Sequence, residues 1–270
     1  MKYFIFLIVL IGYLFASVNE NNKSIFTKEE IEWIKNNPVV KVGIDEDWPP
    51  FEYLDTDKKH NGISSEYLNI ISEKTGLKFD IYASSWHNVM ERIKNKELDI
   101  LACAAKTSER ETFLDFTIPY LSLDAVIVAK KDLKLESFDD VKKYKVAVQK
   151  SDYTYDALIK KFPNLEFVFV ESNSDALKAV SYGKADLYID NLPTISYFIE
   201  KNLLTNLEIK TKAELDSTEL SIAVIKEKNI LKNIIEKVLK DINQEVKKRF
   251  RKSGHFHLVK LIMEILRKKN

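Results

Sequence analysis

Short apolar runs alternate with amphipathic stretches along most of the chain. Continuous apolar runs are typical of strands buried on both faces, and apolar residues three or four positions apart are typical of helices packed on such strands. The alternation therefore predicts an α/β protein. Thr27 and Glu30 add a capping box before a short helix. The expected strands are residues 39–44, 78–82, 98–103, 124–129, 145–148, 166–170, 186–189 and 219–225, and the expected helices are residues 64–74, 86–94, 155–162, 175–182 and 230–246.

These elements fall into two consecutive sets, which predict two lobes. If the chain crosses between the lobes twice, the last strand and the last long helix return to the first lobe. The expected organisation is a signal peptide over residues 1–17, an N-terminal capping helix segment over 18–38, lobe 1 over 39–128 plus 220–246, lobe 2 over 129–219, and a basic amphipathic tail over 247–270.

The start of the chain has the pattern of a signal peptide. Lys2 provides a basic start, residues 4–15 are almost entirely apolar, and Ala16 and Ser17 are small residues suited to cleavage. An apolar run of about twelve residues is short for a membrane span, which needs roughly 20. A cleaved signal peptide is therefore favoured over an uncleaved anchor, and we expect a periplasmic location. The single cysteine allows no intramolecular disulfide.

Composition and charge narrow the function classes. With 270 residues, 45% of them hydrophobic and 31% charged, the chain is expected to be an ordered globular protein. When Lys2 and the nine basic residues after position 246 are set aside, 32 basic side chains face 40 acidic ones between residues 17 and 246. This acidic body disfavours nucleic acid as a partner. The six glycines form neither of the glycine-rich phosphate-binding motifs.

The tail reverses the charge of the body, because residues 247–270 hold nine Lys or Arg and one Glu. Apolar residues at 258, 261, 262, 265 and 266 recur at helical spacing. A basic amphipathic helix can lie on an anionic membrane surface, and it can equally pack on the acidic body or remain solvated. Both alternatives stay open, although a stretch of nine residues is too short to span a bilayer.

Several segments, in order along the chain, carry a family resemblance. They are residues 42–53 (VGIDEDWPPFEY), 98–100 (LDI), 107–110 (TSER), 116–120 (FTIPY), 145–148 (KVAV) and 183–190 (GKADLYID).

Over about residues 39–245 the chain resembles family 3 of the bacterial extracellular solute-binding proteins. Residues 26–38 are more similar to the periplasmic Venus-flytrap sensor modules of two-component kinases and cyclic-dinucleotide enzymes. The resemblance implies the two-lobed periplasmic-binding-protein type 2 fold, with a ligand cleft between the lobes and two hinge crossings. It also implies that a small zwitterion is clamped in the cleft.

Two charged residues match the family's clamp. Arg110 stands at the arginine of the T-x-x-R motif, whose guanidinium donates two parallel hydrogen bonds to a ligand carboxylate. Its alternative is a solvated arginine between Glu109 and Glu111. Asp190 matches the family's ammonium receptor at the end of a strand. Its alternative is a helix N-cap, because a helix is expected directly after it; both roles are compatible.

Other site positions are also implied by the resemblance. Trp48 stands where the family places an aromatic floor, and Tyr53 and Trp86 are weaker candidates, Trp86 being an equally good core residue. Tyr153 and Thr154 follow a strand where the family usually has a Gly-Thr pair, and Cys103 and Ala105 replace hydroxyl residues common in amino-acid binders. These departures, with the added Asp152, leave the specificity open.

No other chemistry stands out. The sequence holds no H-E-x-x-H motif and no Cys/His set, so we expect neither a metal nor a cofactor. Cys103 lies in an apolar strand, which favours an inert buried thiol. Asp45 and Asp47 are interpreted as part of a solvated face, since acidic residues are abundant.

The sequence thus predicts a periplasmic solute-binding protein that closes on a small carboxylate-bearing solute, such as an amino acid, for an ABC permease or a sensor partner. Closure, rather than catalysis, would be the output. The alternative from another class is an enzyme on the same scaffold, since cyclohexadienyl dehydratases resemble solute-binding proteins. A third alternative is a stand-alone or truncated ligand-sensing domain.

Overall fold

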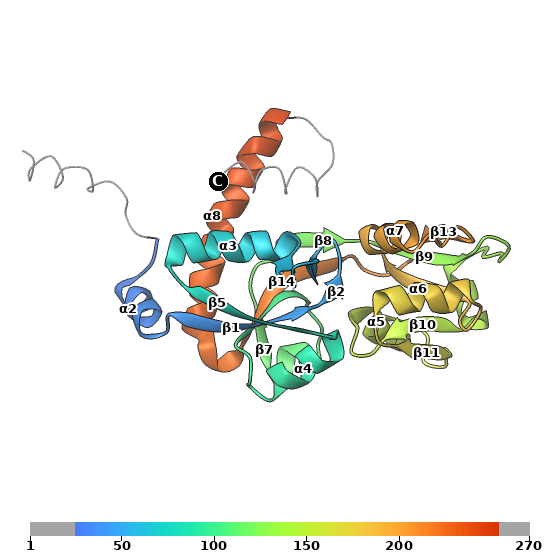
Figure 1. Ribbon diagram of the computed structural model, residues 1–270, viewed down its shortest axis with the longest axis horizontal. Coiled ribbons are helices and arrows are strands. Elements are labelled where there is room, and N and C mark those ends of the chain that lie inside the picture. The colour runs from blue at the N-terminus through green and yellow to red at the C-terminus, as the bar shows by residue number, and fades with distance from the viewer. Residues whose placement is uncertain (1–24, 254–270) are drawn as a thin grey trace, which may run out of the picture.

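Residues 25–253 are described by the computed structural model, with side chains through residue 242. The expected signal peptide and the amphipathic stretch after residue 257 lie outside the described residues, so both stay predictions. Figure 1 shows two lobes side by side, with the C-terminal helix α8 projecting from the first. The predicted two-lobed α/β fold is confirmed.

Lobe 1 is built on a six-stranded sheet in the order β5-β1-β6-β14-β7, with β8 also paired to β14. The two pairs that β1 makes are parallel, whereas β14 is antiparallel to its neighbours. The strands are β1 (Val39–Asp45), β5 (Lys78–Ser84), β6 (Ile100–Ala105), β7 (Leu114–Phe116), β8 (Leu121–Leu123) and β14 (Thr218–Ile225). A small second sheet joins β2 (Asp47–Trp48), β3 (Glu52–Leu54) and β4 (His60–Asn61).

Helices cover both faces of the lobe 1 sheet. The core on one face packs residues of α3 and α8 against the strands, and the core on the other face contains the apolar side of α4. The capping box predicted at Thr27 and Glu30 is present at the start of α2. The helices are α2 (Lys28–Asn36), α3 (Ile63–Thr75), α4 (Trp86–Lys94) and α8 (Asn229–Ser253), with 3₁₀ turns at Arg110–Thr112 and Lys226–Lys228.

Lobe 2 is built on a five-stranded sheet in the order β11-β10-β12-β9-β13. Its first three strands are parallel, and β9 is antiparallel to both of its neighbours. The strands are β9 (Ala125–Lys130), β10 (Val146–Gln149), β11 (Phe167–Val170), β12 (Leu187–Asn191) and β13 (Leu207–Lys212). The helices are α5 (Tyr153–Lys161), α6 (Asn173–Ser181) and α7 (Leu192–Lys201), with a 3₁₀ segment at Phe138–Lys143.

The chain crosses between the lobes twice, after β8 and after β13. The two crossings are tied at Asp124, whose carboxylate contacts Lys212 Nζ at 2.9 Å and accepts a hydrogen bond from Ser217 Oγ at 2.6 Å. The whole of β9 belongs to lobe 2, whereas the expected boundary at residue 128 placed most of that strand in lobe 1. The difference arises because β9 pairs along its length with β12, a strand of the lobe 2 sheet.

Helix α8 extends beyond the limit expected for it. The helix was expected to end at residue 246 and a separate tail to begin at 247, but the helical backbone continues to Ser253. Its buried residues, from Leu231 to Ile242, pack on lobe 1. Among residues 25–253, no helix is both long enough and apolar enough to cross a membrane.

The segment between β2 and α3 is held by backbone contacts that position the cleft-facing residues. Ile63 N donates to Pro50 O at 3.1 Å, and Ser64 N donates to Phe51 O at 2.9 Å. Gly62 makes this close approach possible, since its φ is 106° and a Cβ atom there would lie 2.6 Å from Phe51 O.

We expect Gly62→Ala to lower the free energy of unfolding by about 2 to 5 kcal/mol, because the substitution adds backbone strain and a clash with fixed backbone. Gly76→Ala is the matched control: its φ is 79°, but nothing lies within 4 Å of the added Cβ. The control should cost only about 1 to 2 kcal/mol. Urea denaturation of both variants measures the difference, and equal losses would contradict the close packing at Gly62.

Candidate functional site

A small, partly open cavity lies between the two lobes. Such interlobe cavities near the carboxyl ends of parallel strands are common ligand sites. Lobe 1 supplies six of its lining residues and lobe 2 supplies four. The lining residues are Asp45, Trp48, Trp86, Cys103, Ala105 and Arg110 from lobe 1, and Gln149, Asp152, Tyr153 and Asn173 from lobe 2.

Arg110 is buried, with only 3% of its surface exposed, although Glu109 and Glu111 beside it are exposed. The solvated-arginine alternative is therefore wrong. The T-x-x-R segment helps to position Arg110 at the start of a short 3₁₀ turn. Thr107 Oγ1 accepts a hydrogen bond from the backbone N of Arg110 at 3.3 Å. The guanidinium donates from Nη1 to Ala105 O at 2.8 Å.

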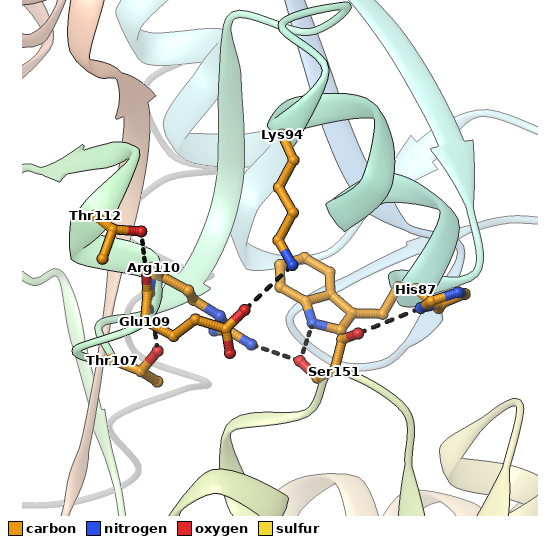
Figure 2. A network of polar contacts seen from close by, with 8 residues as sticks. His87, Lys94, Thr107, Glu109, Arg110, Thr112 and Ser151 are labelled. Atoms are coloured by element: carbon orange, nitrogen blue, oxygen red, sulfur yellow. Dashed lines mark hydrogen bonds and ion pairs between the residues drawn. The ribbon is translucent and has the colours of Figure 1, made fainter.

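Arg110 also reaches across to lobe 2. Its Nη2 donates to Ser151 O at 2.8 Å, and the same carbonyl accepts Trp86 Nε1 at 3.0 Å. Figure 2 shows this network, in which His87 Nδ1 lies 3.3 Å from Ser151 Oγ. With Thr194 Oγ1 donating to Pro49 O at 3.2 Å, these contacts join the lobes directly, so the structure describes a closed clamp.

Enough donors remain on Arg110 for a ligand. A guanidinium carries five N–H groups, and the two described hydrogen bonds use two of them. Burial lowers the pKa of Arg110, and the carboxylates of Asp152 and Asp156 oppose that shift. The Trp86 ring lies 5.1 Å from the guanidinium carbon, so the arginine is also held by a cation–π contact.

The cavity walls combine aromatic and small residues. Trp48 and Trp86 are both buried and both line the cavity, which supports the aromatic wall expected at these positions. Trp86 also belongs to the hydrophobic core formed with α4, so it is both a cavity residue and a core residue. Cys103 and Ala105 form part of the wall from β6, and burial raises the pKa of the Cys103 thiol well above its usual range.

Asp190 lies behind the cavity wall and does not line the cavity. Its carboxylate accepts hydrogen bonds from Tyr153 OH at 3.0 Å, Tyr188 OH at 2.8 Å, and both nitrogens of Asn191 at 2.7 and 2.9 Å. The N-cap alternative for Asp190 is wrong, because Asn191 caps α7 by accepting Thr194 N. In the closed clamp, Asp190 therefore orients the Tyr153 hydroxyl, and Tyr153 itself faces the cavity.

Two further predicted site residues are not among those that line the cavity. Tyr53 lies in β3 of the small sheet, where its neighbour Glu52 points into the protein. Thr154 lies in the first turn of α5, and its backbone N donates to Asp152 Oδ1 at 2.6 Å. The Thr154 hydroxyl is buried without a hydrogen-bond partner among the described residues.

Asp45, Gln149 and Asn173 also line the cavity, and none of them was predicted as a site residue from the sequence. Asp45 is only 5% exposed, so its interpretation as part of a solvated face is wrong. A signal was available for two of these residues, since Asp45 ends the buried strand β1 and Gln149 ends the buried strand β10. The carboxyl ends of parallel strands are where α/β proteins place ligand sites.

The cavity acids have unusual protonation behaviour. Burial raises the pKa of Asp45 to about 7, and the charges of Asp47 and Asp152 add to the rise. Burial also raises the pKa of Asp152 to about 7, with Asp190 adding and Arg110 opposing. A cationic ligand would favour the charged form of both groups. Within residues 25–242, no cluster of three or more His, Cys, Asp or Glu side chains could hold a metal ion.

The family of the chain follows from its sequence. Residues 40–253 match the bacterial extracellular solute-binding proteins, family 3, and the chain belongs to this family. The L-cystine-binding protein TcyA of Bacillus subtilis is 30% identical over 200 residues, which cover 72% of this chain and 74% of that protein. The family and the fold predicted from the sequence are thus confirmed.

Sensor proteins are also among the relatives. The virulence sensor protein BvgS of Bordetella pertussis is 26% identical over 222 residues, which cover 82% of this chain but only 18% of BvgS. The crystal structure of the BvgS periplasmic domain matches with a TM-score of 0.74 and 27% identity, over 82% of this chain and 44% of that chain. The holo form of ArgBP from T. maritima matches with a TM-score of 0.70 and 26% identity, over 81% of this chain and 99% of that one.

Proposed function

We propose that the protein captures a small carboxylate-bearing solute, an amino acid, by closing its two lobes around the interlobe cavity. The observation that carries the proposal is Arg110, a buried guanidinium that faces the cavity from lobe 1 and already bonds to lobe 2. A carboxylate placed in the cavity can accept its remaining N–H groups, and the contact strengthens as closure removes water. The closed form would then be the state that a sensor kinase or an ABC permease recognises.

The relatives support a binding role over an enzymatic one. The names of these relatives describe sensors and binding proteins for L-cystine, histidine or amino acids. A periplasmic location and a partner that reads closure, either a sensor kinase or an ABC permease, belong to this proposal. The dehydratase alternative is tested by incubating the protein with prephenate or arogenate, and product formation would overturn the binding-only proposal.

A thermal-shift screen of the twenty amino acids tests capture. A ligand present at 100 times its Kd stabilises the folded state by about 2.7 kcal/mol. For a chain of this size, that corresponds to a rise in Tm of several degrees, on the order of 5 °C. We expect at least one amino acid to produce it. The corresponding amine without a carboxylate should produce a smaller rise, and the absence of any rise with amino acids would contradict the proposed function.

A further inference from the structure

We propose that two copies of the chain associate through strand β11 of lobe 2, which pairs antiparallel with the same strand of the second copy. Strand β11 lies at the edge of its five-stranded sheet, with β10 as its neighbour on the inner side. Figure 1 shows it along the lower margin of lobe 2. This association is independent of the solute, because β11 contributes no residue to the interlobe cavity.

The backbone of β11 carries hydrogen-bonding groups on its outer side. In the parallel ladder with β10, Val146 pairs with Phe167, and Val146 N donates to Glu166 O at 2.9 Å. The N–H and C=O groups of successive residues in a strand point in opposite directions, so Val168 also faces β10. The backbone groups of Phe167 and Phe169 therefore point away from the sheet, toward the position of an additional strand.

Three aromatic rings lie beside this open edge. The rings of Phe167 and Phe169 lie 5.0 and 5.5 Å from the ring of Tyr155 in α5, measured between centroids. Phe169 is 51% exposed, and Tyr155 and Phe167 are half-buried. An exposed apolar edge strand is a template for pairing with another strand.

Other edge strands carry features that discourage such pairing. Strand β13, at the opposite edge of the same sheet, contains Glu208, Lys210 and Lys212, and its ladder with β9 is interrupted by a register shift. The lobe 1 edge strand β5 contains Lys78 and Asp80. Charges and bulges are the usual protection of sheet edges. Strand β11 reads FVFV and pairs with β10 in an uninterrupted register, so it has neither form of protection.

Strand β11 is complementary to itself. A two-fold axis perpendicular to the sheet makes two copies of the strand antiparallel and keeps their equivalent faces on the same side. With Val168 on the axis, the outward groups of Phe167 meet those of the second copy's Phe169. Each such pair can exchange both N–H···O bonds. The aromatic rings of the two copies then form one continuous surface, with the cross-strand contacts that stabilise sheets.

The charges at the ends of β11 fit this arrangement. Glu166 precedes the strand and pairs with Lys145 at 2.6 Å, and Glu171 follows it and pairs with Lys150 at 3.2 Å. Antiparallel pairing brings the first of these ion pairs in one copy toward the second ion pair in the other. Each acid therefore approaches a neutralised end with a lysine nearby, and the like-charge repulsion that would separate two acidic ends is reduced.

The short strand predicts a weak dimer. Strand β11 has four residues, and the rings beside it extend the contact only to α5. Such an interface falls in the class of transient contacts, which bury less than about 1,200 Å². We therefore expect association that is reversible and concentration-dependent.

Sedimentation equilibrium of the full chain between about 5 and 500 μM measures this association. The weight-average mass should rise from that of the monomer toward that of the dimer. Phe169→Lys places a protective charge on the edge and should raise the Kd of the dimer at least about 10-fold. Ile209→Lys is the matched control, because Ile209 is 41% exposed on the opposite edge strand β13. The control should change this Kd less than about threefold.

Amide hydrogen exchange in the unsubstituted chain locates the contact and does not depend on whether a variant folds. The N–H groups of Phe167 and Phe169 should exchange at least about 10-fold more slowly at high than at low protein concentration. Those of Val168 and Val170, which already face β10, should change less than about twofold. Unchanged exchange at Phe167 and Phe169, or a gain in mass that Phe169→Lys does not reduce in a folded variant, would overturn the proposal. A chain that stays monomeric throughout would also overturn it and leave the edge to an extended segment of a different protein.

Discussion

Replacing Arg110 with alanine is expected to lower the affinity for the solute by a factor of about 100 to several thousand. The substitution leaves the ligand carboxylate without its partner in a site from which closure has excluded water. The expected loss of binding free energy is about 3 to 5 kcal/mol. Arg110→Lys keeps the charge but removes the planar fork, so an intermediate loss is expected. Isothermal titration calorimetry with the amino acid that raises Tm most measures the affinity of both variants.

Arg92→Ala is the control for Arg110. Arg92 is a surface arginine that pairs with Glu97 and does not line the cavity, so its loss should leave binding unchanged. The Tm of each variant without solute checks the fold. If Arg110→Ala is folded and binds the solute within about threefold of the wild type, Arg110 is not the carboxylate anchor.

Asp45→Asn is expected to stabilise the solute-free protein at high pH and not at low pH. The pKa of Asp45 is raised from 3.8 to about 7 by burial, so between these values the unfolded state binds fewer protons than the folded state. The stability contributed by this group therefore falls as pH rises through that window, by about 1.4 kcal/mol for each pH unit. Below pH 4 the residue is neutral in both states, like the asparagine that replaces it.

Urea denaturation at pH 4, 6 and 8 measures this difference. The gap between Asp45→Asn and the wild type should be small at pH 4 and largest at pH 8. The exposed Asp57→Asn serves as a control and should show no such trend. A gap that does not grow with pH would mean that Asp45 is charged at little cost in the closed clamp, and it would contradict the raised pKa of Asp45.

The buried framework could be predicted from the sequence because its strands are long apolar runs. The expected strands at 39–44, 98–103 and 219–225 match β1, β6 and β14 closely. Strand β13 was missed although Leu207 and Ile209 alternate with charged residues, a pattern typical of a half-buried edge strand. The short strands β2, β3 and β4 carry no such pattern, and they are defined by pairing with one another in a separate small sheet.

The site was only partly predictable, for physical reasons. Arg110 and Trp48 stand in local motifs, so the resemblance identified them. Asp45 was predicted to be solvated because its burial depends on the opposite lobe, although its position at the end of strand β1 pointed to the cleft. The cross-lobe carbonyl of Ser151 was equally hidden: its φ of 61° is unusual for a residue other than glycine, and its partners Arg110 and Trp86 are far away in sequence.

A crystal structure with the amino acid that raises Tm most would test the central claim most directly. The proposed function predicts electron density in the interlobe cavity, with the solute carboxylate on the guanidinium of Arg110. Solute bound on the outer surface of either lobe, or bound in the cavity without contact to Arg110, would contradict it.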